Sequence, residues 1–403
     1  WPESNRYQGA VLRSLITYGK VLERNDGTDF FANPKLKSMF DYYIKLQTPV
    51  DKATKFRNVI DPNKGVAVLP GIGNANWSNE WTSVLGWAAP EYAASDPELS
   101  KRMMAAWQRY GSRLDTELSP GVPLGDLIFP DPSLPSEIPT LPTEKFDNIG
   151  YVIFRQDFNN EDKEDYFIYR SSDYYGHHHR DQGSFSIYSD STPLVLDSGC
   201  ASYSDGAQYW YSSSRAHNMV AFKDANGNIK GGPLFSSITD FYTSNTIDYV
   251  QSDIPDAMAA YYHRHVYFVK DGFDAYIVWD DIDSVNNSEI GYNTLSTSTD
   301  IAGNKATAHG YNNMDVEITY LSPDNSAINK SIGGISSING YNQNYVEHLT
   351  VNANAGDDYL TVLYGKKNTD AGLAISMLSV DKTDAAAYKI NKSDGSSIVI
   401  LIN

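Results

Sequence analysis

The sequence predicts an α+β chain of more than one domain, in which helices come first and an antiparallel β-sandwich follows. Three observations predict this class. Apolar residues recur at helical spacing through residues 1–118, prolines gather in residues 119–147, and short alternating strands fill residues 148–403. At 403 residues the chain also exceeds the size at which a single hydrophobic core usually stops growing.

The helical part contains four apolar runs. Two of them are Val11–Leu22 and Leu36–Ile44, the third extends from Trp77 to Tyr92, and the fourth follows Asp96-Pro97. Asp96 is a good helix cap, and proline is favoured at the first helical position after it. Paired helices indicate an α/α arrangement, although four helices alone would make an open one.

The proline-rich segment separates the two parts. Seven of the 18 prolines lie between Ser119 and Lys145: Pro120, Pro123, Pro130, Pro132, Pro135, Pro139 and Pro142. Proline cannot continue a helix, and closely spaced prolines form a semi-rigid connector. We therefore expect residues 119–147 to be a linker.

The remaining residues read as short strands joined by turns. Asn226-Gly227 marks a hairpin turn. The predicted strands, of which the last is expected to be buried, include residues 151–154, 166–169, 184–188, 265–269, 275–279 and 397–402. This pattern predicts an antiparallel β-sandwich over residues 148–403, built as one unit or as two stacked units.

Composition limits the function. The formal charge of −18 argues against nucleic-acid binding, which depends on Lys and Arg. No run approaches the roughly 20 apolar residues that cross a bilayer, so we expect no membrane insertion. Cys200 is the single cysteine, which excludes an intrachain disulfide but fits a cytosolic or an exported bacterial protein equally. The chain opens on Trp1 without a methionine or signal peptide, so we interpret it as a processed or excised piece.

Three of the eight histidines stand together at positions 177–179, directly before Arg180 and Asp181. In a strand, His177, His179 and Asp181 would point to the same face. Asp197 and His217 follow downstream. Two imidazoles and a carboxylate, with one position left for water, suit zinc or manganese. On spacing alone, a surface histidine cluster is the alternative.

These residues also carry a family resemblance. Tyr175–Phe185, Val195–Gly199 and His217-Asn218 resemble the C-terminal β-domain signature of the heparinase II/III-like lyases, which include heparin, heparan and alginate lyases. Trp1–Tyr7 resembles a second signature, in the (α/α) toroid of that family. The resemblance implies that residues 1–118 are the C-terminal part of a toroid and that a β-sandwich follows. It also implies a bacterial protein that is secreted or periplasmic.

The resemblance implies roles for individual residues. Tyr7 and His177 would be catalytic, while His178 is unassigned and Asp181 would orient its neighbours. One divalent ion of structural role is expected, with zinc favoured over manganese and calcium; its ligands would be His179, Asp197 and His217. The weaker expectations for substrate contacts are Glu3, Arg6, Arg180 and Arg264.

The chemistry implied is β-elimination from a uronic-acid polymer. A base removes the proton at C5 of the uronate, an acid protonates the departing oxygen at C4, and a further group neutralises the carboxylate. A tyrosine, with an ordinary pKa near 10, can serve as acid or base when positive charge lies nearby. Histidine is the natural partner near neutral pH. We expect Tyr7 to be the acid, with His177 as base on one substrate epimer.

One departure from the family pattern predicts a partner. The asparagine or histidine that neutralises the carboxylate lies upstream of the catalytic tyrosine in this family, yet only six residues precede Tyr7. We therefore expect the chain to associate with its own N-terminal toroid portion, as a separate or cleaved chain.

Three functions remain in competition. The acidic balance favours an alginate lyase over a glycosaminoglycan lyase acting on heparan, chondroitin or hyaluronan. A non-catalytic carbohydrate-binding relative would bind glycans without forming unsaturated product. A metal-dependent glycoside hydrolase would need two carboxylates facing each other across a cleft, and no such pair stands out.

Overall fold

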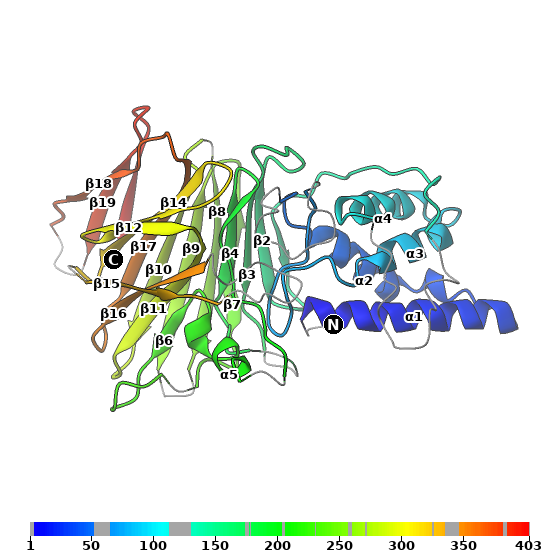
Figure 1. Cartoon of the computed structure of the whole chain (residues 1–403), viewed down its shortest axis with the longest axis horizontal. Coiled ribbons are helices and arrows are strands. Elements are labelled where there is room, and N and C mark those ends of the chain that lie inside the picture. Colours follow the sequence, from blue (N-terminus) through cyan, green and yellow to red (C-terminus); the bar gives the residue numbers. More distant parts are fainter. Residues whose placement is uncertain are drawn as a thin grey trace.

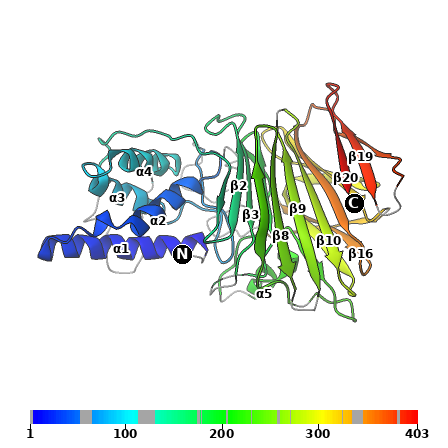
Figure 2. The same ribbon diagram turned by 180° about the vertical axis from the view of Figure 1, so that it is seen from behind.

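In the computed structural model, helices occupy the N-terminal part and strands form stacked sheets beyond it (Figures 1 and 2). Within the described part of the chain, no helix is both long and apolar enough to cross a membrane. The described residues are 4–51, 65–112, 130–173, 177, 179–203, 206–229, 231–256, 260–270, 272–324, 326–334, 346–381 and 385–402.

The helices confirm most of the predicted apolar runs. Asp96 caps α4 by accepting a hydrogen bond from the Leu99 amide, with Pro97 at the first helical position, and Gly27 ends α1 with a left-handed φ of 75°. The helical elements are α1 (Asn5–Asp26), η1 (Phe30–Ala32), α2 (Pro34–Lys45), α3 (Ser83–Tyr92), α4 (Pro97–Arg109), α5 (Gln208–Tyr211) and η3 (Ser214–Ala216).

The predicted start of the third helix was wrong, because α3 begins at Ser83 and not near Trp77. The Trp77 side chain is buried, and its indole donates a hydrogen bond to the Asp197 carbonyl at 2.8 Å. The Ser78 carbonyl accepts a bond from the Leu69 amide, also at 2.8 Å. Contacts with the strand region therefore hold this segment out of the helix.

Two large antiparallel sheets pack face to face. In the first, the order is β1-β2-β3-β4-β5-β11-β16-β15, and β6 also pairs with β11. Its strands are β1 (Glu144–Phe146), β2 (Tyr151–Gln156), β3 (Asp165–Arg170), β4 (Phe185–Ser189), β5 (Thr192–Val195), β6 (Val220–Phe222), β11 (Ser288–Leu295), β15 (Ile328–Ile332) and β16 (Val346–Ala353).

The second large sheet has the order β12-β13-β14-β17-β10-β9-β8-β7, and a three-stranded sheet, β18-β19-β20, lies beyond it. The strands of the second large sheet are β7 (Ser237–Thr243), β8 (Ile247–Pro255), β9 (Tyr261–Val269), β10 (Ala275–Asp283), β12 (Ser298–Ala302), β13 (Lys305–His309), β14 (Met314–Ser322) and β17 (Tyr359–Lys367). The three-stranded sheet contains β18 (Ala374–Leu378), β19 (Ala386–Asn391) and β20 (Ser397–Ile402).

Hydrophobic clusters hold these layers together. The cluster between the two large sheets includes the buried residues Phe167 and Tyr276. A second cluster joins the helices to the first sheet, and it includes Leu12 and Tyr151. Burial of such apolar surface is the main favourable contribution to folding, so the helices and the first sheet are fixed against each other.

The strand predictions were confirmed with two corrections. The strand region begins at β1, inside the segment expected to be a linker, whose residues 113–129 lie outside the described residues. The last strand, β20, is not buried, because its residues alternate between exposed and half-buried. It lies at the edge of the small sheet, where only one face packs against the neighbouring layer. The division into residues 1–118, 119–147 and 148–403 stays a prediction.

Candidate active site

Tyr7 and His177 come together where the helices meet the strands. Their rings are stacked, with centroids 3.8 Å apart and planes inclined by 13°. Tyr7 is half-buried in the first turns of α1, and His177 is exposed on the loop that follows β3. The two residues that we expected to be catalytic therefore form one accessible pair.

The start of α1 is anchored by Asn5. Its side-chain amide donates to the Pro70 carbonyl at 3.0 Å, its side-chain oxygen accepts from the Tyr42 hydroxyl at 2.9 Å, and its carbonyl accepts from the Tyr43 hydroxyl. Buried polar groups that are fully hydrogen-bonded hold a unique geometry. Asn5 thus fixes the helical turn that presents Tyr7.

His177 and His179 lie outside the strands, so the shared strand face considered for His177, His179 and Asp181 does not apply. His177 has a left-handed φ of 63°, which is uncommon for a residue with a side chain and costs of order 1–3 kcal/mol. The loop is held from both sides: the Asn74 amide donates to the His177 carbonyl at 3.0 Å, and the Gly73 amide donates to Asp181 at 2.9 Å. Asp181 also forms a buried ion pair with Arg170 at 2.6 Å, which anchors this end of the loop.

Three residues that the sequence did not single out complete the pair: Asn74, Tyr203 and Gln208. The Tyr7 and Tyr203 hydroxyls lie 2.8 Å apart, and the buried Asn74 amide donates to both of them. Gln208 then bridges the Asn74 oxygen, at 3.5 Å, and the His179 Nε2, at 3.3 Å. The only hint in the sequence was a loop of glycines and asparagines before Trp77.

Tyr203 is well placed to donate its proton to Tyr7. Partial burial and the adjacent Tyr7 hydroxyl raise the pKa of Tyr203 above its ordinary value. At neutral pH its hydroxyl is therefore protonated. The arrangement offers Tyr7 two hydrogen-bond donors, one from Tyr203 and one from Asn74.

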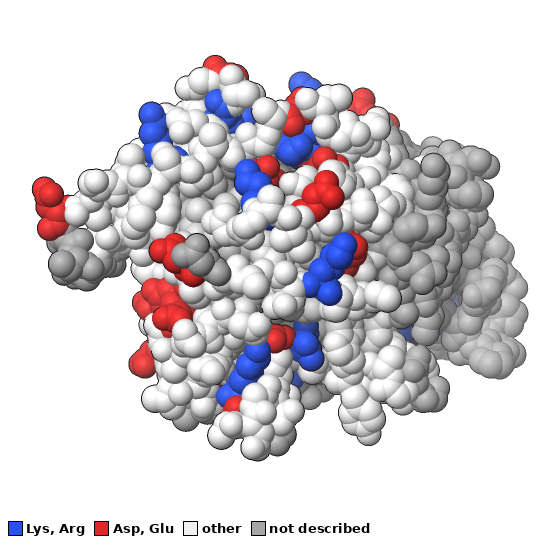
Figure 3. All heavy atoms as spheres, turned by 60° about the vertical axis from the view of Figure 1, so that its left-hand side comes forward, with Lys and Arg blue, Asp and Glu red and all other residues white. Residues whose placement is uncertain are grey.

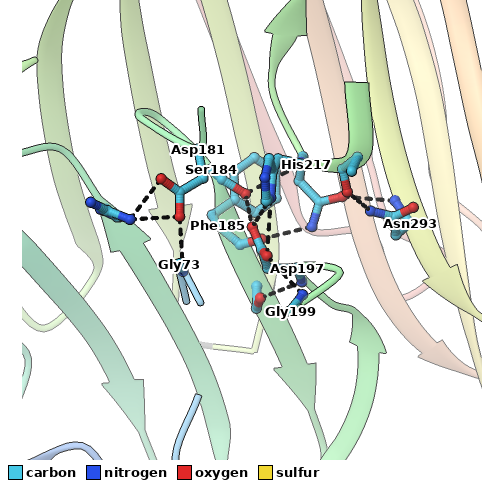
Figure 4. Close-up of polar contacts among 12 residues, drawn as sticks. Gly73, Asp181, Ser184, Phe185, Asp197, Gly199, His217 and Asn293 are labelled. Carbon is cyan, nitrogen blue, oxygen red and sulfur yellow. Dashed lines mark hydrogen bonds and ion pairs between the residues drawn. The ribbon is translucent and has the colours of Figure 1, made fainter. Parts of the chain in front are cut away.

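The three predicted metal ligands are all buried. Asp197, two residues after the end of β5, lies against His217 (Figure 4). His217 Nδ1 contacts the Asp197 carboxylate at 2.9 Å, and the His179 and His217 ring centroids are 5.5 Å apart. Ser184 and the Gly199 amide also donate to Asp197, at 2.6 and 3.1 Å. Within the described residues, no group of three or more His, Cys, Asp or Glu side chains lies close enough together to hold a metal ion.

Two imidazole nitrogens in this group are donors of the kind that a divalent ion binds. Among the described residues, His179 Nδ1 and His217 Nε2 are buried and have no hydrogen-bond partner. Burial lowers the pKa of His179 to about 3, so its imidazole is neutral, which is the form that binds metal. Burial also disfavours a charged His217, but the Asp197 carboxylate outweighs it and raises the pKa of His217.

The four residues expected to contact substrate have different surroundings in the structure. Arg264 is fully buried and ion-paired with Asp280 at 2.6 Å, so it does not reach the surface and its expected role in substrate binding was wrong. Arg180 donates to the Gly232 carbonyl at 2.9 Å. Arg6 lies beside Tyr7 on α1 and pairs with Glu80 at 3.5 Å, which leaves its side chain 38% exposed. Glu3 and His178 lie outside the described residues.

Comparison with known proteins identifies a family for part of the chain. Residues 138–321 match the family described as Heparinase II/III-like, C-terminal. This part of the chain is similar to the C-terminal domain of that family. No curated protein was found to match the sequence. The match confirms the family resemblance drawn from the histidine block.

Solved heparinase structures share the fold of this chain. A heparan sulfate lyase from Pedobacter heparinus aligns with a TM-score of 0.73 over 98% of this chain and 57% of its own, at 14% identity. A heparinase III gives a TM-score of 0.72 over 98% and 59% of the two chains, also at 14% identity. This chain thus spans less than three fifths of each neighbour, and at these identities the likeness concerns the fold.

Proposed function

We propose that this heparinase II/III-like chain is part of a polysaccharide lyase that cleaves a uronic-acid polymer by β-elimination. The observation that carries the proposal is the stacking of Tyr7 on His177 at 3.8 Å, at an accessible junction of helices and strands. A hydroxyl and an imidazole in contact provide the acid and base that elimination needs.

The proposed reaction removes one proton from the polymer and returns one proton to the departing oxygen. A base, His177 or Tyr7 according to the epimer, takes the proton from C5. The C4–O bond breaks, a C4–C5 double bond forms, and Tyr7 protonates the departing oxygen. The two hydrogen-bond donors to Tyr7 stabilise its oxygen whenever it carries negative charge.

We favour a polymer that carries carboxylates without sulfates, such as alginate. The formal charge is −18, and basic side chains of the strand region are interspersed with acidic ones on the face seen in Figure 3. Lys305 pairs with Glu317 at 2.8 Å, for example, and Lys330 with Glu347 at 3.1 Å. Heparan sulfate is the second candidate, because a structural neighbour is a heparan sulfate lyase.

We further infer that His179, Asp197 and His217 hold one divalent ion, zinc by preference. When bound, the ion would supply a fixed positive charge that ties the loops behind the catalytic pair together. The four helices would belong to an (α/α) toroid, whose preceding portion supplies the group that neutralises the substrate carboxylate. We infer a secreted or periplasmic location for the protein, where it would meet a polysaccharide outside the cytoplasm.

The test is ultraviolet absorbance of the unsaturated product during incubation with alginate, hyaluronan, chondroitin and heparan sulfate. The native polypeptide that contains these residues should raise the absorbance on one polymer. Tyr7→Phe should lower the rate by about two to four orders of magnitude, the usual contribution of a general acid or base. Tyr18→Phe is the matched control, since Tyr18 is on the same helix and 54% exposed.

The competing functions give different results. New reducing ends without a rise in absorbance would indicate hydrolysis and refute elimination. Glycan binding without any product would favour the non-catalytic relative.

A further inference from the structure

Asn74 stands at the centre of the contacts around Tyr7. It comes from the segment between α2 and α3 and is 3% exposed. Its side-chain nitrogen donates to the Tyr7 hydroxyl, at 3.2 Å, and to the Tyr203 hydroxyl. Its side-chain oxygen accepts from Gln208, and its backbone amide donates to the His177 carbonyl.

This pattern places the Asn74 amide against both phenols. The Asn74 amide nitrogen is within hydrogen-bond distance of both phenolic oxygens, which lie 2.8 Å from each other. The single Tyr7–Tyr203 contact uses one of the two hydroxyl hydrogens. The second hydroxyl hydrogen is then available to a reacting oxygen, and Asn74 holds both phenols in place while it is transferred.

We propose that Asn74 is a positioning residue that aligns Tyr7 with His177 and stabilises the deprotonated oxygen of Tyr7. It acts through Tyr7, because it is buried and binds the tyrosine hydroxyl rather than the polymer. The kinetic part of this inference rests on the proposed lyase function. The effect on Tyr7 itself does not, because it follows from the hydrogen bond alone.

Other charged and titratable groups surround the pair. His177 stacks on the Tyr7 ring, and Arg6 and its partner Glu80 lie beside it on the helical side. Cys200 and His179 lie near the far side, where Cys200 contacts Asn76 and His179 contacts Gln208. An Asn74 variant replaces none of these charged groups, and its side chain reaches one of them, His179, through Gln208.

The experiment uses Asn74→Ala and Asn74→Asp in the native polypeptide, with Asn76→Ala as the matched control. Asn76 is on the same segment and 5% exposed, but its side-chain oxygen accepts from Cys200. Two quantities are measured: kcat and KM for elimination, and the pH dependence of Tyr7 nitration by tetranitromethane. Nitration requires the phenolate, and peptide mass spectrometry locates the modified residue.

Asn74→Ala should lower kcat about ten-fold or more, with KM changed less than about two-fold. The nitration midpoint of Tyr7 should move up by about one pH unit, as expected for the loss of a hydrogen bond to a charged oxygen. Asn74→Asp keeps the side-chain shape and brings a carboxylate to the phenols, so its midpoint should move further. Asn76→Ala should move neither quantity.

An unchanged nitration midpoint in folded Asn74→Ala and Asn74→Asp would overturn the proposal, as would equal effects in Asn76→Ala. If no polymer is cleaved, the lyase function fails by itself. The nitration comparison then still decides the role of Asn74.

Discussion

Arg264 offers a sharp test of how the site is supported. The side chain is completely buried, and it donates two parallel hydrogen bonds to the Asp280 carboxylate, at 2.6 and 2.9 Å. Its third nitrogen donates to the Gly183 and Asn218 carbonyls, at 2.5 and 2.8 Å. Gly183 follows the histidine loop and Asn218 follows His217, so Arg264 ties both segments to the second sheet.

Arg264→Met should therefore destabilise the fold strongly. The variant keeps most of the side-chain volume but leaves a buried carboxylate without its cation. Removal of one partner from a buried ion pair usually costs about 3–5 kcal/mol. Burial alone would lower the pKa of Arg264, but Asp280 outweighs it and raises the pKa, so the arginine is charged at every accessible pH.

The assay is the free energy of unfolding from urea denaturation, with Arg215→Met as the control. Arg215 pairs with Glu289 at 3.1 Å, but its side chain is 54% exposed, so its loss should cost less than about 1 kcal/mol. The double variant Arg264→Met with Asp280→Leu should recover part of the loss, because it removes the orphaned charge. If Arg264→Met costs no more than Arg215→Met and weakens only substrate binding, the structural reading is refuted.

Three further results are expected. Burial lowers the pKa of His348 from 6.5 to about 4, so the folded state resists protonation and stability should fall by about 3 kcal/mol as pH drops from 6.5 to 4. Urea titrations at several pH values should show a smaller fall in His348→Asn. His217→Ala should lower the zinc content of the native polypeptide, measured by mass spectrometry, and abolish the drop in melting temperature caused by a chelator; equal zinc in both proteins would contradict the metal assignment. Gly150→Ala should cost at least about 1 kcal/mol more than Gly227→Ala, since both have positive φ but only the first Cβ would meet a backbone carbonyl, that of Ser171; equal losses in denaturation would remove that explanation.

Local sequence patterns predicted the elements well because they record which side chains are buried. The apolar spacing of α1 and α2, the Asp96-Pro97 start of α4 and the alternation along β9 all describe single elements. The same patterns placed the start of α3 too early. Trp77 fits a helical apolar run, but its indole donates a hydrogen bond to the Asp197 carbonyl, which belongs to a segment far away in the sequence.

The candidate site shows the same division. The sequence by itself carried the family resemblance and, with it, the candidate residues Tyr7, His177, His179, Asp197 and His217. Those residues are distinctive in type and order, so they could be found without coordinates.

Tertiary structure alone decided which of these residues are in contact. Tyr7 meets His177, and Asn74 joins them, because the helical part packs on the first sheet through a shared core. Arg264 looked like a surface cation beside two histidines, yet its strand turns it inward to Asp280. Sequence periodicity shows that a side chain is directed to one face of an element, but the partner across that face comes from a remote segment, which only the packing of the layers selects.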